Sequence, residues 1–294
     1  MLVYSRYSDI IHGRDSRRDI FELDSTNPGH QLVRQAATGV GMLVSNQNLY
    51  YDGSSAPRLE TNREAIEACK GDQKFIDQPK FTGVCATAFL INERHVVTAG
   101  HVVNTRSVSE LTVVFRYYAE PDWRDHVKGD SKPYQLERAQ LARVDYMLYC
   151  SASAPMGDLA VLHLADAVDP RVAVPLQIAP RQSLRNGPGI SMIGHPRGLP
   201  CKAVVGDVDL KGWPLVWSYD SRSAQTNVDT FQANSGSPLL DPFGRVIGVM
   251  SSLPSPHEPR RGCIQVLPET PGTAWCSRID LIADLLENLG IPGI

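Results

Sequence analysis

Short apolar runs bounded by turn-forming residues recur along most of this chain. Many of their residues are β-branched or aromatic, and Gly, Asn, Asp or Pro separate them, which favours strands over helices. The runs are residues 38–44, 85–91, 95–98, 111–115 and 159–164, and later 189–194, 202–208, 215–219 and 245–252. Asp241-Pro242-Phe243-Gly244 predicts a hairpin turn between two runs. The pattern therefore predicts an all-β protein of short antiparallel strands.

The runs fall into two zones, with distinct segments around them. Residues 1–35 are charged and irregular and contain the turn signal Asn27-Pro28-Gly29, so we expect an N-terminal extension. Residues 36–165 and 187–276 are the strand-rich zones, and the Pro- and Arg-rich residues 166–186 link them. Residues 277–290 place apolar side chains at helical spacing, which predicts a C-terminal helix with Ser277 as cap and Gly290 as stop.

Size and charge restrict the class of protein. The chain has 294 residues, 42% of them hydrophobic, and a formal net charge of -3. The size allows one large domain or two small ones, and the charge predicts no nucleic-acid or membrane partner. No apolar run approaches the about 20 residues of a membrane helix. Because the start lacks a signal-peptide pattern, we expect either a secreted or periplasmic protein whose signal is absent from this sequence, or a cytoplasmic protein.

Three segments carry the residue types of a serine hydrolase. Ser235 is followed by glycine where the chain must turn and expose one hydroxyl, His101 follows a strand-like run and a small-residue turn, and Asp158 precedes an apolar run. A serine hydroxyl is a weak nucleophile that needs a base, and the base needs a third group to fix its tautomer. Alone, the histidine fits an ordinary loop role and the aspartate a turn or cap role. Together the three residues predict a catalytic triad.

These segments together resemble the trypsin-like (chymotrypsin-fold) serine endopeptidases, and the Asn-Ser-Gly-Ser-Pro form looks most like bacterial members, including the glutamyl endopeptidase branch. The resemblance covers about residues 80–290. It implies two six-stranded antiparallel β-barrels with a C-terminal α-helix, His101 and Asp158 being in the first barrel and Ser235 in the second. It also implies a monomer that hydrolyses proteins or peptides through an acyl-enzyme on Ser235. His101 is then the general base and acid, Asp158 orients it, and no cofactor or metal takes part.

The family's oxyanion hole corresponds to the backbone N–H groups of Ala233 and Ser235. The family usually has glycine where this chain has Ala233. A Cβ there opposes the backbone orientation that aims the N–H inward, which leaves open reduced activity or a hole formed only when substrate binds. His195 is the main rival base, but it lies between the Asp and Ser segments, where the family has no base. We therefore expect His195 to be structural.

Asn234 is a second departure from the family. Animal digestive relatives have Asp at this position, where it pairs with a newly cut N-terminal ammonium. Asn offers no charge for that pair, so we expect Asn234 to hold its loop by hydrogen bonds within the protein. We also expect the Ser235 loop to be ordered in the uncut chain, with residues 1–35 packed on the body or covering part of the groove.

Asp229 is the candidate for primary specificity. It lies six residues before Ser235, where relatives that cleave after Arg or Lys have the floor of the pocket. The alternative is that Asp229 serves the turn and points away. Met250 stands where glutamate-specific relatives have a histidine, which argues against acidic specificity. The resemblance further implies that substrate contacts Thr230, Gln232, Ser251, Ser252 and Leu253.

The chain has six cysteines and no Cys-x-x-Cys pair, so we expect no zinc site and either up to three disulfides or six buried thiols. Cys85 matches a family cysteine whose usual partner position is Val102 here, so Cys85 must be free or bonded elsewhere. The expected pairs are Cys69–Cys85, Cys263–Cys276 and, mainly by elimination, Cys150–Cys201.

Two other functions remain open at this point. A catalytically weak homologue that acts as a protein-binding module is favoured by Ala233 and disfavoured by the presence of all three triad residues. An esterase that acts on small acyl substrates would use the same machinery. Labelling of Ser235 by a fluorophosphonate probe would separate an active hydrolase from a binding module.

Overall fold

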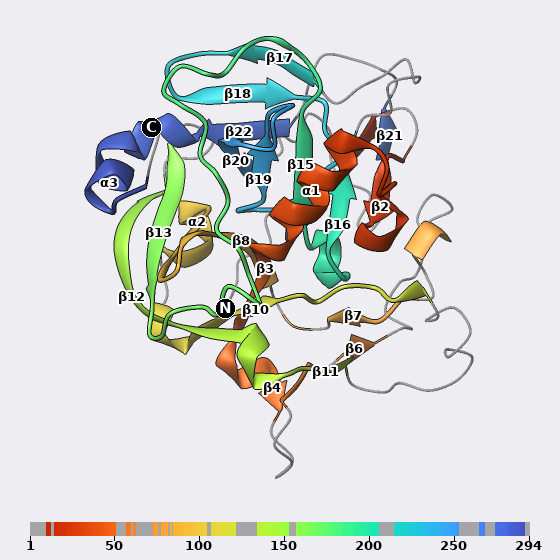
Figure 1. Ribbon diagram of the computed structural model, residues 1–294, viewed down its shortest axis with the longest axis vertical. Coiled ribbons are helices and arrows are strands. Elements are labelled where there is room, and N and C mark those ends of the chain that lie inside the picture. Colours follow the sequence, from red (N-terminus) through yellow and green to blue (C-terminus); the bar gives the residue numbers. More distant parts are fainter. Residues whose placement is uncertain are drawn as a thin grey trace.

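Two strand-rich units and three α-helices make up the described part of the chain in this computed structural model (Figure 1). The helix α1 precedes the strands of the first unit, and the helix α3 follows the last described strand, β22. The structure describes residues 10–12, 15–50, 57–59, 61–62, 73–75, 78–81, 83, 85–104, 107–121, 134–152, 157–205, 215–252, 265–267 and 274–291.

The first unit is a closed six-stranded barrel in the order β10-β12-β13-β9-β8-β3. Its neighbouring strands all pair antiparallel. Apolar side chains such as Leu43, Leu90, Val113 and Leu162 fill a buried cluster in this unit. The strands are β3 (Val40–Ser45), β8 (Cys85–Asn92), β9 (His95–Thr98), β10 (Leu111–Phe115), β12 (Leu141–Ala152) and β13 (Asp158–Leu164).

The second unit is a nine-stranded sheet in the order β14-β17-β18-β22-β20-β19-β15-β16-β2, and its two end strands do not pair with each other. The expectation of two closed six-stranded barrels is therefore met only by the first unit. A strand from the N-terminal segment, β2, lies on the edge of β16 and extends the sheet. The strands are β2 (Arg17–Asp19), β14 (Gly187–Pro188), β15 (Ser191–Gly194), β16 (Lys202–Val204), β17 (Leu215–Tyr219), β18 (Ser223–Thr226), β19 (Pro238–Leu240), β20 (Val246–Ser252) and β22 (Ala274–Arg278).

We had expected residues 1–35 to form an irregular extension. This expectation was wrong, because the helix α1 (Pro28–Thr38) begins within this segment. The side chain of Asn27 caps this helix by accepting hydrogen bonds from the backbone of Gly29 and His30, at 2.9 and 3.2 Å. Proline is favourable at the first helical position, so Asn27-Pro28-Gly29 starts a helix rather than a free turn. One face of α1 is buried in the apolar cluster between the units.

The C-terminal helix begins later than the sequence predicts. Ser277 belongs to β22, and a 3-10 turn, η8 (Ile279–Ile282), precedes the helix α3 (Ala283–Asn288). Gly290 has a φ of 75° and ends the helix as expected, since glycine takes the left-handed conformation without strain. The hairpin turn predicted between β19 and β20 is also present, and Gly244 occupies its left-handed position with a φ of 75°.

Short elements complete the fold. The predicted link, residues 166–186, contains none of the helices or strands assigned in the described chain and touches the second sheet through a parallel bridge from Ile178 to Val246. Three small sheets are formed by β4 (Leu49–Tyr50), β5 (Arg58–Leu59) and β11 (Tyr134–Gln135), by β6 (Thr61–Asn62) and β7 (Lys80–Phe81), and by β1 (Ile10–His12) and β21 (Gln265–Leu267). The remaining helix is α2 (Gly100–Val103), and the other 3-10 turns are η1 (Ile20–Glu22), η2 (Asn46–Asn48), η3 (Gln73–Phe75), η4 (Val108–Glu110), η6 (Arg138–Gln140) and η7 (Pro196–Gly198).

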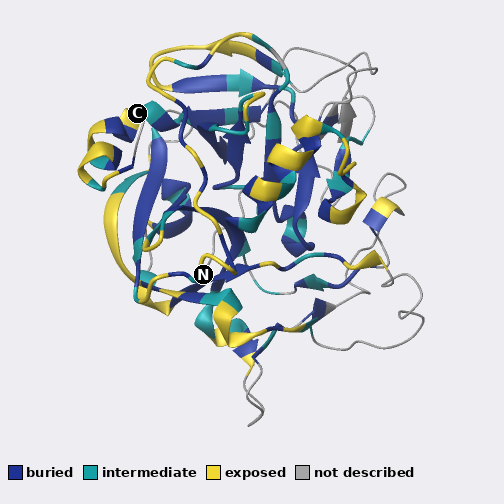
Figure 2. Cartoon of the chain, in the orientation of Figure 1, coloured by how far each residue is buried: buried dark blue, intermediate teal, exposed yellow. Residues whose placement is uncertain are grey.

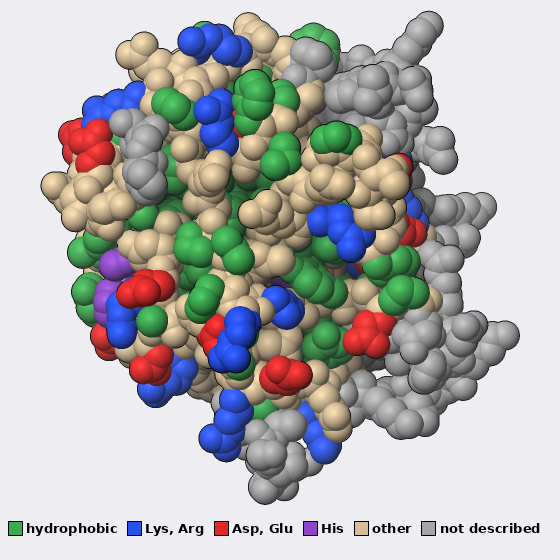
Figure 3. Space-filling model, in the orientation of Figure 1, with side chains coloured by type: hydrophobic (Ala, Val, Ile, Leu, Met, Phe, Trp, Pro, Cys, Tyr) green, Lys and Arg blue, Asp and Glu red, His purple; other side chains and the backbone are tan. Residues whose placement is uncertain are grey.

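An apolar core joins the two units. Phe89 and Val97 from the barrel belong to the same buried cluster as Ile193 and Leu240 from the second sheet and Leu286 from α3. Figure 2 shows the barrel strands and the second sheet as mostly buried, while β12 presents an exposed face. On the face drawn in Figure 3, basic and acidic side chains are interspersed. The core fixes the two units against each other and so fixes any site between them.

Candidate active site

The structure brings His101, Asp158 and Ser235 together at the junction of the two units. His101 lies in α2 directly after β9, and Asp158 is the first residue of β13, which pairs with β9. Ser235 lies in the turn before β19 of the second sheet. His101 Nδ1 is 2.6 Å from Asp158 Oδ2, and His101 Nε2 is 3.0 Å from Ser235 Oγ. These distances place base, nucleophile and carboxylate within hydrogen-bond reach.

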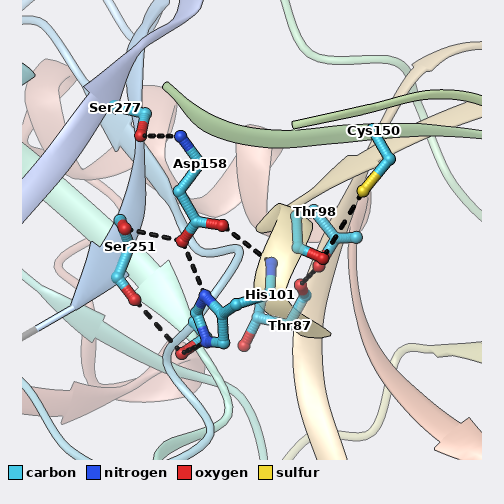
Figure 4. A network of polar contacts seen from close by, with 9 residues as sticks. Thr87, Thr98, His101, Cys150, Asp158, Ser251 and Ser277 are labelled. Carbon is cyan, nitrogen blue, oxygen red and sulfur yellow. Dashed lines mark hydrogen bonds and ion pairs between the residues drawn. The ribbon is translucent and has the colours of Figure 1, made fainter. Parts of the chain in front are cut away.

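Asp158 is fully buried, and its carboxylate is satisfied by several donors (Figure 4). The backbone N–H of His101 donates to Oδ1 at 2.7 Å, and the hydroxyl of Ser251 donates to Oδ2 at 2.6 Å. Burial alone raises the pKa of Asp158, but the hydrogen bond and charge of His101 and the hydrogen bond from Ser251 outweigh it, so that the pKa lies below its usual value. The carboxylate is therefore ionised near neutral pH and accepts the Nδ1 proton of His101.

Because Nδ1 of His101 carries the proton that Asp158 accepts, Nε2 has a free lone pair, and this lone pair faces Ser235. Ser235 Oγ also lies 3.4 Å from the carbonyl oxygen of Ser251. About a third of the His101 side chain is exposed, at 32%, so the base sits at the surface while its carboxylate is closed off from water. The arrangement can move a proton from the Ser235 hydroxyl to His101.

Two residues that support Asp158 were assigned other roles from the sequence. Ser251 was predicted to contact substrate, and its hydroxyl also donates to Asp158, a contact that the sequence did not indicate. Ser277 was expected to cap the C-terminal helix, but its hydroxyl accepts the backbone N–H of Asp158 at 2.9 Å. Both lie on adjacent strands, β20 and β22. Because this placement depends on long-range strand pairing, no local pattern in the sequence indicates it.

The loop before Ser235 forms a tight turn. Asn234 N–H donates to the carbonyl of Phe231 at 3.1 Å, and Ala233 has a φ of 71° at the third position of this turn. A type II turn requires a positive φ there and usually has glycine. Within the part of the chain that the structure describes, no group accepts a hydrogen bond from the N–H of Ala233 or of Ser235. Both donors are thus available to a substrate oxygen.

Comparison with known protein families identifies the family to which this chain belongs. The family model of the trypsin-like peptidase domain matches residues 86–249, which is more than half of the chain. The chain is a trypsin-like peptidase. The match includes His101, Asp158 and Ser235, and the protein is accordingly a serine endopeptidase. No curated protein matches the sequence significantly.

Solved structures show the same fold as this trypsin-like peptidase at low sequence identity. A Glu endopeptidase structure superposes with a TM-score of 0.54 at 16% identity, covering 95% of this chain and 98% of the other. A serine endoprotease from Yersinia pestis gives 0.52 at 15% identity, covering 90% and 68%, and Deg5 gives 0.50 at 16% identity, covering 92% and 99%. At these identities the likeness concerns the fold.

Asp229 of the peptidase is buried and contacts the N-terminal segment. The backbone N–H of Ser16 donates to Asp229 Oδ2 at 2.7 Å, and the Ser16 hydroxyl donates to the same oxygen. Its neighbour Thr230 is also buried, and the carbonyl of Gln232 accepts from Arg197 N–H at 2.6 Å. Ser252 lies in β20, and Leu253 falls outside the described residues.

His195 and Asn234 are both buried near the Ser235 loop. His195 Nδ1 lies 3.2 Å from the carbonyl oxygen of Leu199, its ring stacks on Tyr117, and burial lowers its pKa to about 3. His195 is therefore packed in the interior, and none of its hydrogen bonds in the described structure joins it to His101, Asp158 or Ser235. The expectation for Asn234 was wrong in one respect: among the described residues its buried Oδ1 has no hydrogen-bond partner, and backbone groups hold the turn instead.

The disulfide predictions were wrong. The cysteines that the structure describes are all free thiols, which excludes Cys150–Cys201 directly and leaves Cys85 and Cys276 unbonded. Their expected partners, Cys69 and Cys263, lie outside the described residues. Cys201 belongs to the cluster between the units while Cys150 packs against the barrel cluster, which explains why elimination failed. The described residues contain no group of His, Cys, Asp and Glu that could hold a metal ion and no helix long and apolar enough to cross a membrane.

Proposed function

We propose that this endopeptidase hydrolyses peptide bonds through an acyl-enzyme on Ser235. Ser235 Oγ attacks the scissile carbonyl while His101 Nε2 takes its proton, and the ionised Asp158 stabilises the resulting imidazolium. The N–H groups of Ala233 and Ser235 donate to the oxyanion of the tetrahedral intermediate. His101 then gives the proton to the leaving amine, and a water molecule, activated by the same base, hydrolyses the acyl-enzyme.

One observation carries this proposal: the continuous contact from Asp158 through His101 to Ser235, at 2.6 and 3.0 Å. The available N–H groups beside the nucleophile agree with it. They also weigh against a catalytically inactive binding module, because a positive φ at Ala233 already orients the turn in the absence of substrate.

The triad is tested by substitution and active-site labelling. Ser235→Ala should abolish peptide and ester hydrolysis and labelling by a fluorophosphonate, because it removes the hydroxyl that contacts His101 Nε2. The matched control is Ser218→Ala, which removes an exposed serine on β17 and should leave both unchanged. Turnover by purified Ser235→Ala would refute the assignment. Cleavage of a protein substrate by the parent that is lost in Ser235→Ala would separate a peptidase from an esterase.

For primary specificity we propose a preference for Arg or Lys before the cut, set by Asp229 and weakened by Ser16. A carboxylate selects a cationic side chain by direct pairing, and the two hydrogen bonds from Ser16 compete with that pairing. Ser16→Ala should therefore raise the ratio of kcat/KM for an Arg ester over a Leu ester. Asp229→Ser should abolish the preference. A peptide-library profile with equal cleavage after Leu, Phe and Glu would exclude Asp229 from the pocket.

A further inference from the structure

Ala233 adopts a backbone conformation that its side chain disfavours. Its φ of 71° lies in the left-handed region, where a Cβ is strained and where glycine is the usual residue. Gly236, on the other side of Ser235, has a φ of 90° without that cost. A strained residue persists only where its surroundings determine it, so some contact must hold Ala233 in place.

The carbonyl on the N-terminal side of Ala233 is held by a second turn. Gln232 C=O accepts the backbone N–H of Arg197 at 2.6 Å. Arg197 itself has a φ of 53° in η7, the 3-10 turn after β15. In a planar trans peptide the C=O and the next N–H point in opposite directions. Binding the Gln232 carbonyl on one side therefore directs the Ala233 N–H to the other side.

The carbonyl on the C-terminal side of Ala233 is held by Thr87 of β8 in the first barrel. The Thr87 hydroxyl donates to Ala233 C=O at 2.9 Å and accepts the backbone N–H of His195 at 3.1 Å. The backbone N–H of Thr87 donates to Ser235 C=O at 2.9 Å. Thr87 is fully buried, and its own carbonyl is fixed by the hydroxyl of Thr98 at 2.7 Å (Figure 4).

We propose that Thr87 is a positioning residue for the oxyanion hole, acting with the turn at residues 195–198. Together they fix the peptide planes on both sides of Ala233 and keep its N–H directed toward the substrate oxygen, in place of the conformational freedom that glycine would provide. The inference rests on the proposed function of Ser235 and adds a residue from the other unit to the machinery. It also explains why alanine is compatible with a formed hole in this chain.

The test compares Thr87→Val with Thr87→Ser. Valine keeps the shape and removes the hydroxyl, whereas serine keeps the hydroxyl. We expect Thr87→Val to lower kcat for an ester by about 10-fold to 100-fold, up to the loss typical of one missing oxyanion donor, with KM unchanged. Phenylboronic acid, a mimic of the tetrahedral adduct, should bind Thr87→Val more weakly by a similar factor. Thr87→Ser should stay within about threefold of the parent in both measurements.

A second substitution distinguishes positioning from a general loss of packing. Glycine at position 233 takes a positive φ without strain, so it should depend less on Thr87. In the Thr87→Val background, Ala233→Gly should restore most of the lost kcat, whereas a loss caused by poor packing would persist. A tenfold or larger increase in kcat on Ala233→Gly in the parent background would show that the hole is not formed in the parent and would overturn the proposal, even if Thr87→Val fails to fold.

The outcomes separate this inference from the triad. If Ser235→Ala retains turnover, the proposed function fails and the role of Thr87 fails with it. If Ser235→Ala is inactive but Thr87→Val matches the parent in kcat and in phenylboronic acid affinity, only the positioning role is wrong. Folding of each variant is checked by thermal unfolding and near-UV circular dichroism.

Discussion

At the scale of single residues, the buried carboxylate of Asp158 contacts Nδ1 of His101, the residue that we propose as the catalytic base. Asp158→Asn should reduce kcat by about 10⁴, because an amide cannot hold His101 in the tautomer that leaves Nε2 free. Ester turnover measured under single-turnover conditions, with unfolding followed by circular dichroism, checks this. A reduction below about tenfold would contradict the role of Asp158 as the orienting residue.

Ser251 supports the same carboxylate, and its loss should be visible in the pH dependence of stability. The pKa of Asp158 is lowered in the folded protein, so its contribution to stability is present above the unfolded value and disappears as the pH falls through the folded value. Ser251→Ala removes one cause of the lowering and should shift acid unfolding to a higher pH. Acid titrations of both proteins, followed by circular dichroism, test this. Ser218→Ala serves as the control and should leave the midpoint unchanged.

The cysteines differ in exposure and should differ in reactivity. Burial raises the pKa of Cys85, Cys201 and Cys276 to about 12, which keeps these thiols protonated. Cys150 is partly buried, as is Cys85, but burial followed by the charge of Asp158 raises the pKa of Cys150 to a lesser degree. Among these four, iodoacetamide should therefore modify Cys150 first in the native protein. Peptide mass mapping after brief labelling measures the order, and faster labelling of Cys201 would contradict it.

At the scale of elements, α1 shows that a local turn pattern does not determine which element follows it. The residues Asn27-Pro28-Gly29 are recognisable as a break in the chain, but whether they end a loop or start a helix depends on what the following residues pack against. Here Val33 and Ala37 are buried between the units. Asn27→Ala should destabilise the protein by about 1 kcal/mol, and Asn27→Asp, which keeps a capping oxygen, by much less. Thermal unfolding distinguishes them, and equal melting temperatures would contradict the capping role.

Most strands could be predicted from the sequence because their apolar runs are short, continuous and bounded by turns. β8, β9, β10, β13 and β20 all appear close to their predicted positions. The longest strand, β12, was not predicted. Its register shifts twice against β13, at residues 144–146 and 147–149, and much of its surface is exposed, so that no alternation of apolar and polar residues marks it. β2 was missed because its polar residues become buried only against partners distant in sequence.

At the scale of the whole molecule, the proximity of His101, Asp158 and Ser235 could be predicted because each lies in its own local motif, whereas the residues that support them could not. Ser251, Ser277 and Thr87 reach the site from three different strands, and only the packing of the two units brings them there. The contact between Ser16 and Asp229 likewise depends on the tertiary fold, since it joins residues 213 positions apart in the sequence. A motif therefore identifies the reacting atoms, and the tertiary fold determines how they are held.

Residues 15–35 of the N-terminal segment are part of the folded body, and this determines what their removal should do. Asp19 is buried, and Lys202 forms an ion pair with it, while Gln78 hydrogen-bonds to both partners. Removing one member of such a pair leaves an uncompensated buried charge, which typically costs about 3–5 kcal/mol. Deleting residues 1–19 would remove Asp19 and leave Lys202 as a buried charge without its ion-pair partner. It would also expose the edge of β16, which pairs with β2.

We therefore expect the intact chain to be active, and the chain without residues 1–19 to be less stable and less active. Lys202→Met in the truncated protein should recover part of the stability, because it removes the stranded charge. Melting temperatures and ester turnover of the intact, truncated and truncated Lys202→Met proteins measure this. In the intact protein the turn before Ser235 is held by backbone hydrogen bonds and needs no new N-terminus. A large rise in activity after cleavage near Arg34, with the new amino group buried beside Asn234, would show that the segment is an activation peptide instead.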